Sequence, residues 1–197
     1  MGPPGAGKGT QAELIGHHFE VPTISTGAMF RAEVAAETEL GKRVEALMNA
    51  GKYVPDDLTE EIVKSRLDRR DTIHGFLLDG FPRTPAQVEA LDEYLAEKDL
   101  ALDAVISLEV DGDALVERLL RRAELEGRAD DNEETIRNRM QIYRDETAPL
   151  LKTYGERGIL VSVSGEGSIE SVARRAFQAI VASHLPTLES VRASRAD

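Results

Sequence analysis

Residues 2–10 read GPPGAGKGT. The spacing Gly2-x4-Gly7-Lys8 is that of a P-loop, in which glycines let consecutive backbone N–H groups turn inward around a phosphate while the lysine adds positive charge. The strict pattern has serine or threonine directly after the lysine to reach Mg²⁺, but here Gly9 fills that position and the hydroxyl follows at Thr10. The alternative is a glycine-rich loop that only turns the chain. We predict a phosphate site at the start of a helix over residues 11–18.

A P-loop follows a buried strand, yet only Met1 precedes Gly2 in this chain. Such a strand needs roughly 5–6 residues. We therefore expect that the natural protein begins further upstream.

Length, composition and charge narrow the class of protein. A chain of 197 residues suits one domain with inserted segments. No run approaches the roughly 18 apolar residues of a membrane span, and the absence of cysteine excludes disulfides and thiolate metal sites. A net charge of −12 argues against a nucleic-acid binder, which needs a basic face. We expect a cytoplasmic protein with no membrane or nucleic-acid partner, whose phosphate site must gather its own cations.

Apolar runs predict buried strands at residues 21–24, 76–78, 104–110 and 159–163. Helical patterns separate these runs, which indicates a parallel sheet with crossover helices. Residues 184–197 turn polar and contain a proline, so we predict a frayed tail.

The residues between the first two predicted strands form a helical excursion too long for a simple crossover. We interpret 25–69 as a small inserted subdomain. Within it, Thr38 is the expected cap of one helix and Thr59 the expected start of another.

The stretch FLLDGFPR at 76–83 ends the second predicted strand with a carboxylate, a turn and a guanidinium. Ligands bind at the carboxyl ends of strands in open α/β sheets, where Asp79 and Arg83 would lie. Pro85 then occupies the first position of a helix, and Thr84 with Gln87 has the spacing of a capping box.

Four arginines follow within a short stretch. Arg118 and Arg122 share one helix face, Arg128 lies in a short loop, and Arg139 flanks a helix that Asp131 is expected to cap. A solvated basic face is the alternative. Like charges on neighbouring turns repel, however, unless an anion lies among them.

Four motifs in this order resemble the adenylate kinase family: GPPGAGKGT at 2–10, STGxxxR at 25–31, DGFPR at 79–83 with Gln87, and GRxDDNEET at 127–135. The match runs from Gly2 to about Ile180. The segment between Arg122 and Arg128 is short and has no cysteine, so it is similar to the short-lid form of the family and not to the form that can hold zinc.

This resemblance implies an α/β P-loop kinase fold with a parallel five-stranded sheet, its first strand truncated here, flanked by helices. The core would comprise 1–24, 70–121 and 133–184, the insert that binds the nucleoside monophosphate (NMP) 25–69, the short lid 122–132, and the tail 185–197. In this family the first strand is central, so its absence would leave backbone groups unpaired at a cost on the order of several kcal/mol. We therefore expect this chain to be unstable or poorly active.

The family transfers a phosphoryl group reversibly, ATP + AMP giving two ADP, with Mg²⁺ accompanying ATP, no zinc, and a monomeric enzyme. By resemblance, Asp79 would hold Mg²⁺ through water. Catalysis would fall to Lys8, Arg83, Arg122, Arg128 and Arg139. ATP would contact Gly5, Ala6, Gly7, Lys8, Gly9, Thr10, Arg118, Arg122 and Gly167; AMP would contact Thr26, Arg31, Lys52, Tyr53, Val54, Gly80, Arg83, Gln87, Arg128 and Arg139.

The charges suit this reading. ATP and AMP together carry roughly −6, and one Mg²⁺ leaves roughly −4, which the clustered basic side chains can offset. One departure is Ala28, because the family usually has aspartate there, to cap the helix or orient Arg31; we expect weaker AMP binding. Two structural alternatives remain: Thr26 could cap the helix after Gly27, and Gln87 could serve its own helix end.

Other functions make different demands on these positions. A UMP/CMP kinase usually has alanine at the position of Thr26 and lacks Gln87. A nucleotide-binding module without catalysis would not retain Arg122, Arg128 and Arg139, and a purely structural α/β domain would need no arginine cluster. The sequence therefore favours an adenylate kinase.

Overall fold

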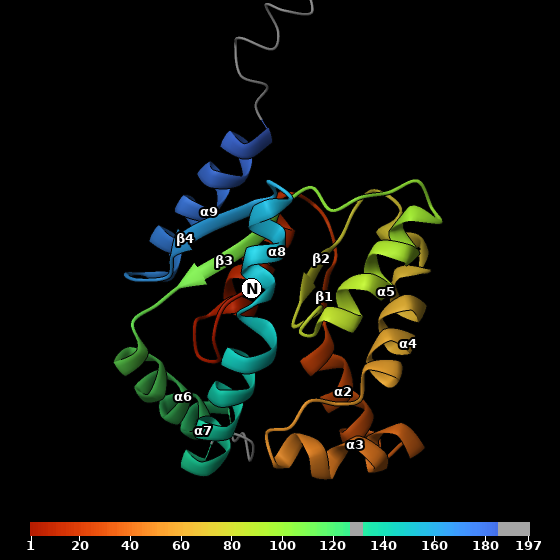
Figure 1. Ribbon diagram of the computed structural model, residues 1–197. Helices are drawn as coiled ribbons and strands as arrows, with labels where there is room; N and C mark the ends of the chain where they lie inside the picture. Colours follow the sequence, from red (N-terminus) through yellow and green to blue (C-terminus); the bar gives the residue numbers. More distant parts are fainter. Residues whose placement is uncertain (127–131, 185–197) are drawn as a thin grey trace, which may run out of the picture.

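The computed structural model describes residues 1–126 and 132–184, which form four strands in two parallel pairs (Figure 1). Strand β1 (Thr23–Ser25) pairs with β2 (Leu77–Asp79), and β3 (Val105–Glu109) pairs with β4 (Leu160–Ser164). The predicted strands are all present, with ends within two residues of the expected ones. The α/β class is confirmed, but within the described residues the strands form two separate two-stranded sheets in place of the expected five-stranded one.

The first residue of the chain lies along β3. The backbone N–H of Leu108 donates to the carbonyl of Met1 at 3.0 Å, and the Met1 amine donates to the carbonyl of Ile106. Gly2 follows at a φ of 134°, where an added Cβ would lie only 2.8 Å from the Leu108 carbonyl oxygen. Only glycine fits this approach, which brings residues 2–10 to the carboxyl end of β3.

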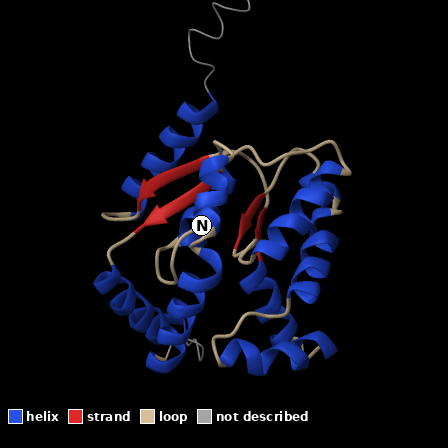
Figure 2. Ribbon diagram, in the orientation of Figure 1, coloured by secondary structure: helices blue, strands red, loops and turns tan. Residues whose placement is uncertain are grey.

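Helices surround both strand pairs (Figure 2). Helices α2, α3, α6 and α7 lie on the side toward which the strand arrows point (Figure 1). The helices are α1 (Lys8–His18), α2 (Thr26–Ala35), α3 (Glu39–Asn49), α4 (Asp56–Leu67), α5 (Pro85–Ala96), α6 (Gly112–Glu126), α7 (Glu133–Ile142), α8 (Leu150–Glu156) and α9 (Ile169–His184), with a 3₁₀ turn at Arg70–Thr72 and a π-helical turn at Tyr143–Thr147.

Separate apolar clusters hold these elements together. Ile15 of α1, Leu108 of β3 and Ala176 of α9 belong to one cluster, which packs two helices against the β3–β4 pair. Ile24 of β1 and Leu91 of α5 belong to a second cluster beneath α4 and α5. Burial of apolar area at this density is the main favourable term in folding.

The helices of the 25–69 excursion have an apolar cluster of their own. Phe30 of α2, Val44 of α3 and Val54 are its buried members, and Val44 is fully buried. This cluster packs α2, α3 and α4 together beside β1, so the excursion does not depend only on the sheet for its burial.

Three predicted helix starts are wrong by one to three residues. Helix α1 begins at Lys8, three residues before the expected start at residue 11, because Gly7, at a φ of 87°, is its N-cap. Helix α4 begins at Asp56, three residues before Thr59, because Pro55 fixes the N-cap position; the Thr59 hydroxyl lies in the next turn and donates to the Pro55 carbonyl at 3.0 Å. Helix α7 is capped by Asn132, whose side-chain oxygen accepts from the Thr135 N–H at 3.0 Å. Asp131, the expected cap, lies outside the described residues.

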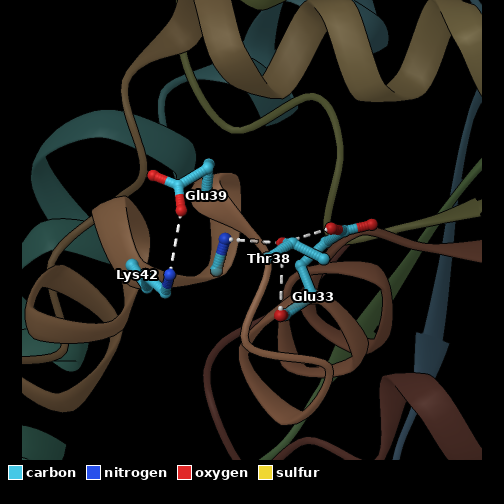
Figure 3. A network of polar contacts seen from close by, with 5 residues as sticks. Glu33, Thr38, Glu39 and Lys42 are labelled. Atoms are coloured by element: carbon cyan, nitrogen blue, oxygen red, sulfur yellow. Dashed lines mark hydrogen bonds and ion pairs between the residues drawn. The ribbon is translucent and has the colours of Figure 1, made fainter.

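Thr38 caps α3 as expected (Figure 3). Its hydroxyl oxygen accepts from the Gly41 N–H at 3.0 Å and donates to Glu33 Oε2 at 2.6 Å. The neighbouring ion pair between Lys42 and Glu39 is 2.8 Å long, but its side chains are 60% and 89% exposed. The cap satisfies an orphan helix N–H, whereas solvent screens the ion pair.

We predict that Thr38→Ala lowers the free energy of unfolding by about 1–2 kcal/mol, because α3 loses its cap. The matched control, Lys42→Ala in the same turn, should change it by less than about 0.5 kcal/mol. Urea unfolding followed by circular dichroism measures both. Equal effects for the two variants would contradict the role assigned to the cap.

Candidate functional site

The loop 2–10 and the strand ends open onto one cleft of about 1150 Å³. Gly7 precedes α1 at a φ of 87° and offers no side-chain cap, so the first N–H groups of this helix remain available to an anion. An added Cβ on Gly5 would lie only 2.8 Å from the Leu115 carbonyl oxygen. The absence of a side chain at Gly5 therefore lets the loop lie close to α6. The predicted site residues that line the cleft include Gly5, Gly7, Lys8, Gly9, Thr10, Asp79, Arg118 and Arg122.

Lys8 turns its ammonium back into the loop. Its Nζ donates to the carbonyls of Gly2 and Pro3, both at 2.8 Å. Desolvation lowers the pKa of Lys8 to about 7, Asp79 opposes this shift, and Arg83 adds to it. The side chain is therefore a cation that an arriving phosphate would stabilise.

Asp79 lies at the end of β2, opposite the first turn of α1. Ser25 Oγ donates to Asp79 Oδ2 at 3.2 Å, and an added Cβ on Gly9 would lie 3.7 Å from the same oxygen. Magnesium binds through one or two carboxylates plus waters and substrate phosphates. A single carboxylate beside a phosphate loop, with the Thr10 hydroxyl in the same cleft, fits that ion.

A smaller pocket, of about 80 Å³, adjoins the cleft. Tyr53, Gly80, Arg83 and Arg139 are among the residues that line both. All the residues predicted to hold AMP line the small pocket except Arg128, which lies outside the described residues: Thr26, Arg31, Lys52, Tyr53, Val54, Gly80, Arg83, Gln87 and Arg139. Phe30 and Met48, which we did not predict, add apolar walls. Their helical spacing marks them only as core residues.

Thr26 does not cap α2, so that alternative is wrong. Ser25 is the N-cap, and its hydroxyl oxygen accepts from the Ala28 N–H at 3.4 Å. The Thr26 side chain is buried and its hydroxyl donates to the Gly80 carbonyl at 2.9 Å. Thr26 thereby joins the start of α2 to the turn after β2.

Arg83 is held from three directions. Its Nε donates to the Gly80 carbonyl at 2.8 Å, and its guanidinium lies 5.0 Å from the centre of the Tyr53 ring. Thr147 Oγ1 donates to the Arg83 carbonyl at 2.8 Å and lies 2.9 Å from the Tyr53 hydroxyl. Because Thr147 has a single hydroxyl hydrogen, Tyr53 is the donor in the second bond.

Gln87 is only 1% exposed, and both ends of its amide have partners. Oε1 accepts from the Arg83 N–H at 2.8 Å, and Nε2 donates to Asp56 Oδ1 at 2.6 Å. Thr84 Oγ1 accepts from the Gln87 N–H at 3.2 Å, which is one half of the expected capping box. The other half reaches one residue further back, to Arg83, so Gln87 does serve its helix end while also lining the small pocket.

Some of the remaining predicted site residues line the cavities and others do not. Arg118 and Arg122 of α6 line the cleft, and Arg118 lies 3.4 Å from the Gly165 carbonyl oxygen. Helix α7 docks on the end of α3, where Asn138 donates to the Ala50 carbonyl at 2.8 Å. No motif or periodicity in the sequence predicts this contact, and Arg139 of the same helix lines both cavities. Neither Ala6 nor Gly167 is among the described residues that line either cavity.

The chain is similar in sequence to known proteins over most of its length. Within the described residues, no helix is long and apolar enough to cross a membrane. A model of the family named Adenylate kinase matches residues 1–159. An adenylate kinase from Nocardioides sp. is 52% identical over 91% of this chain and 94% of its own length. Those from Thermobifida fusca and Clavibacter michiganensis are 49% and 53% identical, over 91% and 89% of this chain and 95% and 88% of their own lengths.

The lowered pKa of Lys8 predicts pH-dependent anion binding. Above a pKa of about 7 the free side chain loses its proton, and a bound phosphate restores it. The affinity for inorganic tripolyphosphate should therefore fall as the pH rises from about 6.5 to about 8.5, by up to about tenfold per unit, with proton uptake on binding. Calorimetry in buffers of different ionisation enthalpy measures both. Lys8→Arg stays charged and should take up no proton there; equal uptake by this variant would contradict the assignment.

Proposed function

Because this chain belongs to the adenylate kinase family, we propose that its two adjoining cavities bind the two nucleotides of one phosphoryl transfer. The protein is an adenylate kinase, a phosphotransferase that converts ATP and AMP reversibly into two ADP. In our proposal, ATP occupies the large cleft at residues 2–10 and AMP the small pocket. One observation supports this assignment most strongly. Nine residues predicted to contact AMP line the same small pocket, and two of them, Arg83 and Arg139, also line the cleft.

Each cavity offers its nucleotide a different chemistry. At the ATP side, the N–H groups at the start of α1 and the Lys8 ammonium face the phosphates. At the AMP side, Arg31 and Arg83 would hold the phosphate while Phe30, Val54 and Gln87 surround the base. Arg118 lies near Gly165, at the edge where the donor adenine would lie.

The transfer itself needs positioning and charge, with no general base. The phosphate of AMP is an anion at neutral pH and attacks the terminal phosphorus of ATP in line, while the bond from that phosphorus to the bridging oxygen breaks and ADP leaves. Arg122 and Arg139, which line the cleft between the nucleotides, would stabilise the charge on the phosphoryl group in flight. Arg128 would join them. Asp79 would hold Mg²⁺ through water, and the ion would supply positive charge that offsets the charge of the phosphates.

The chain would divide by function. The core comprises 1–24, 70–121 and 133–184, the NMP-binding insert 25–69, the short lid 122–132 and the tail 185–197. The separate apolar cluster of α2, α3 and α4 supports an insert that can move as a unit. Closure of insert and lid would exclude water from the phosphoryl group. We propose a cytoplasmic monomer.

The assignment predicts a strong preference for AMP as acceptor. With Mg·ATP as donor and this chain as enzyme, kcat/KM for AMP should exceed that for CMP and UMP by at least about a hundredfold. Coupled nucleotide assays with the three acceptors in parallel measure this. A preference for CMP or UMP would instead indicate a UMP/CMP kinase, and no transfer to any acceptor would indicate a binding module.

Arg139 provides a second test. Arg139→Ala should lower kcat on the order of 10³-fold, because it removes a charge that stabilises the transition state. Arg137→Ala is the matched control on the same helix, since Arg137 is exposed and its guanidinium pairs with Glu133 at 2.6 Å. The control should keep wild-type kcat. Similar losses in both variants would mean that damage to α7, and not the charge at 139, reduces the rate.

A further inference from the structure

The orientation of the Gln87 amide is fixed by two partners of opposite polarity. The oxygen of a glutamine amide and its nitrogen have nearly the same shape, so hydrogen-bond partners decide which occupies which position. Here the Arg83 N–H can only donate, and it faces Oε1 at 2.8 Å. The Asp56 carboxylate can only accept, and it faces Nε2 at 2.6 Å. Turning the amide over would place donor against donor and acceptor against acceptor at a side chain that is 1% exposed.

Asp56 is itself held in place from the core. Its Oδ2 accepts from Thr84 Oγ1 at 2.9 Å, and the same hydroxyl oxygen caps α5. Asp56 is also the first residue of α4, where a negative charge is favoured by the helix dipole. The carboxylate therefore connects α4 to the start of α5. It is not among the described residues that line the small pocket, so it acts on a ligand only through Gln87.

We propose that Asp56 is a positioning residue that sets which bases the monophosphate pocket accepts, by fixing the polarity of Gln87. This inference rests on the proposed function of that pocket. With Arg83 and Asp56 engaged, the amide has one lone pair on Oε1 and one hydrogen on Nε2 left for a ligand. An aminopurine edge offers a donor beside an acceptor and matches this pair. A ketopurine edge, of the same size, offers an acceptor beside a donor and opposes it.

The chain contains a matched control in the next position. Asp57 lies in the same first turn of α4 and carries the same charge, but it is exposed. Asp56→Ala removes the acceptor that faces Nε2. Asp56→Asn retains a carbonyl oxygen that can face Nε2, while its amino group can donate to Thr84 Oγ1. Asp57→Ala removes a helix-terminus charge without touching Gln87. These three variants separate the polarity of Gln87 from general effects on the helix.

The test compares AMP with IMP, a purine monophosphate of equal size and reversed polarity, at saturating Mg·ATP. For Asp56→Ala we expect KM for AMP to rise about tenfold and the ratio of kcat/KM for AMP to that for IMP to fall about tenfold. Asp56→Asn and Asp57→Ala should keep the wild-type ratio within about twofold. Calorimetric binding of each monophosphate without ATP should show the same order of variants.

Two results would overturn the inference. If Asp56→Ala weakens AMP and IMP equally, so that the ratio is unchanged, Asp56 supports the helix start and does not set base preference. If Asp57→Ala lowers the ratio as much, the effect belongs to charge at the helix end. Thermal unfolding verifies that each variant folds, and Asp56→Ser gives the same comparison if the alanine variant does not fold. A wild-type chain that transfers nothing to AMP would instead refute the proposed function, and this inference with it.

Discussion

The close approach of residues 2–10 to β3 and α6 is the constraint on which the rest of the site depends. Gly2 lies against the Leu108 carbonyl and Gly5 against the Leu115 carbonyl, at separations that no Cβ would permit. With the loop in this position, the uncapped start of α1 faces the cleft, and the Lys8 ammonium donates to the carbonyls of Gly2 and Pro3. Asp79 at the end of β2 and Arg83 in the segment after it then line the same cleft. The position of the proposed phosphate site thus follows from the close contact of this loop with the backbone of β3 and α6.

Electrostatics explains why the cations are so concentrated. The chain carries a net charge of −12, which would repel nucleotides from most of its surface. Around the cleft, however, Lys8 lies within the field of Arg83, Arg122 and Arg139, and its pKa falls to about 7 because of desolvation first and these neighbours in addition. Such a cluster is unfavourable when empty. A bound polyphosphate would reduce the repulsion among these cations, which would favour its binding where we propose that transfer occurs.

The acceptor side is organised by hydrogen bonds between segments far apart in the chain. Thr26 reaches Gly80, Tyr53 reaches Thr147, and Gln87 reaches Asp56. Each bond joins the segment 25–69 to a residue outside it. Because these groups are buried or half-buried, an unmet partner would be costly. The pocket geometry is consequently specified by polar contacts, while Phe30 and Met48 supply volume.

The sequence by itself determined the glycine-rich loop at residues 2–10, the four strands to within two residues, the Thr38 cap and most of the residues around the small pocket, because these depend on local spacing and on motifs that recur in order. Only the tertiary structure decided what depends on distant partners. It made Ser25, and not Thr26, the cap of α2, and it separated the strands into two pairs. It also left Gly167 out of the described residues that line the cavities, docked α7 on α3, and joined Asp56 to Gln87. A hydrogen bond across 31 or 88 residues leaves no periodicity in the chain; it exists only once packing has brought both groups together.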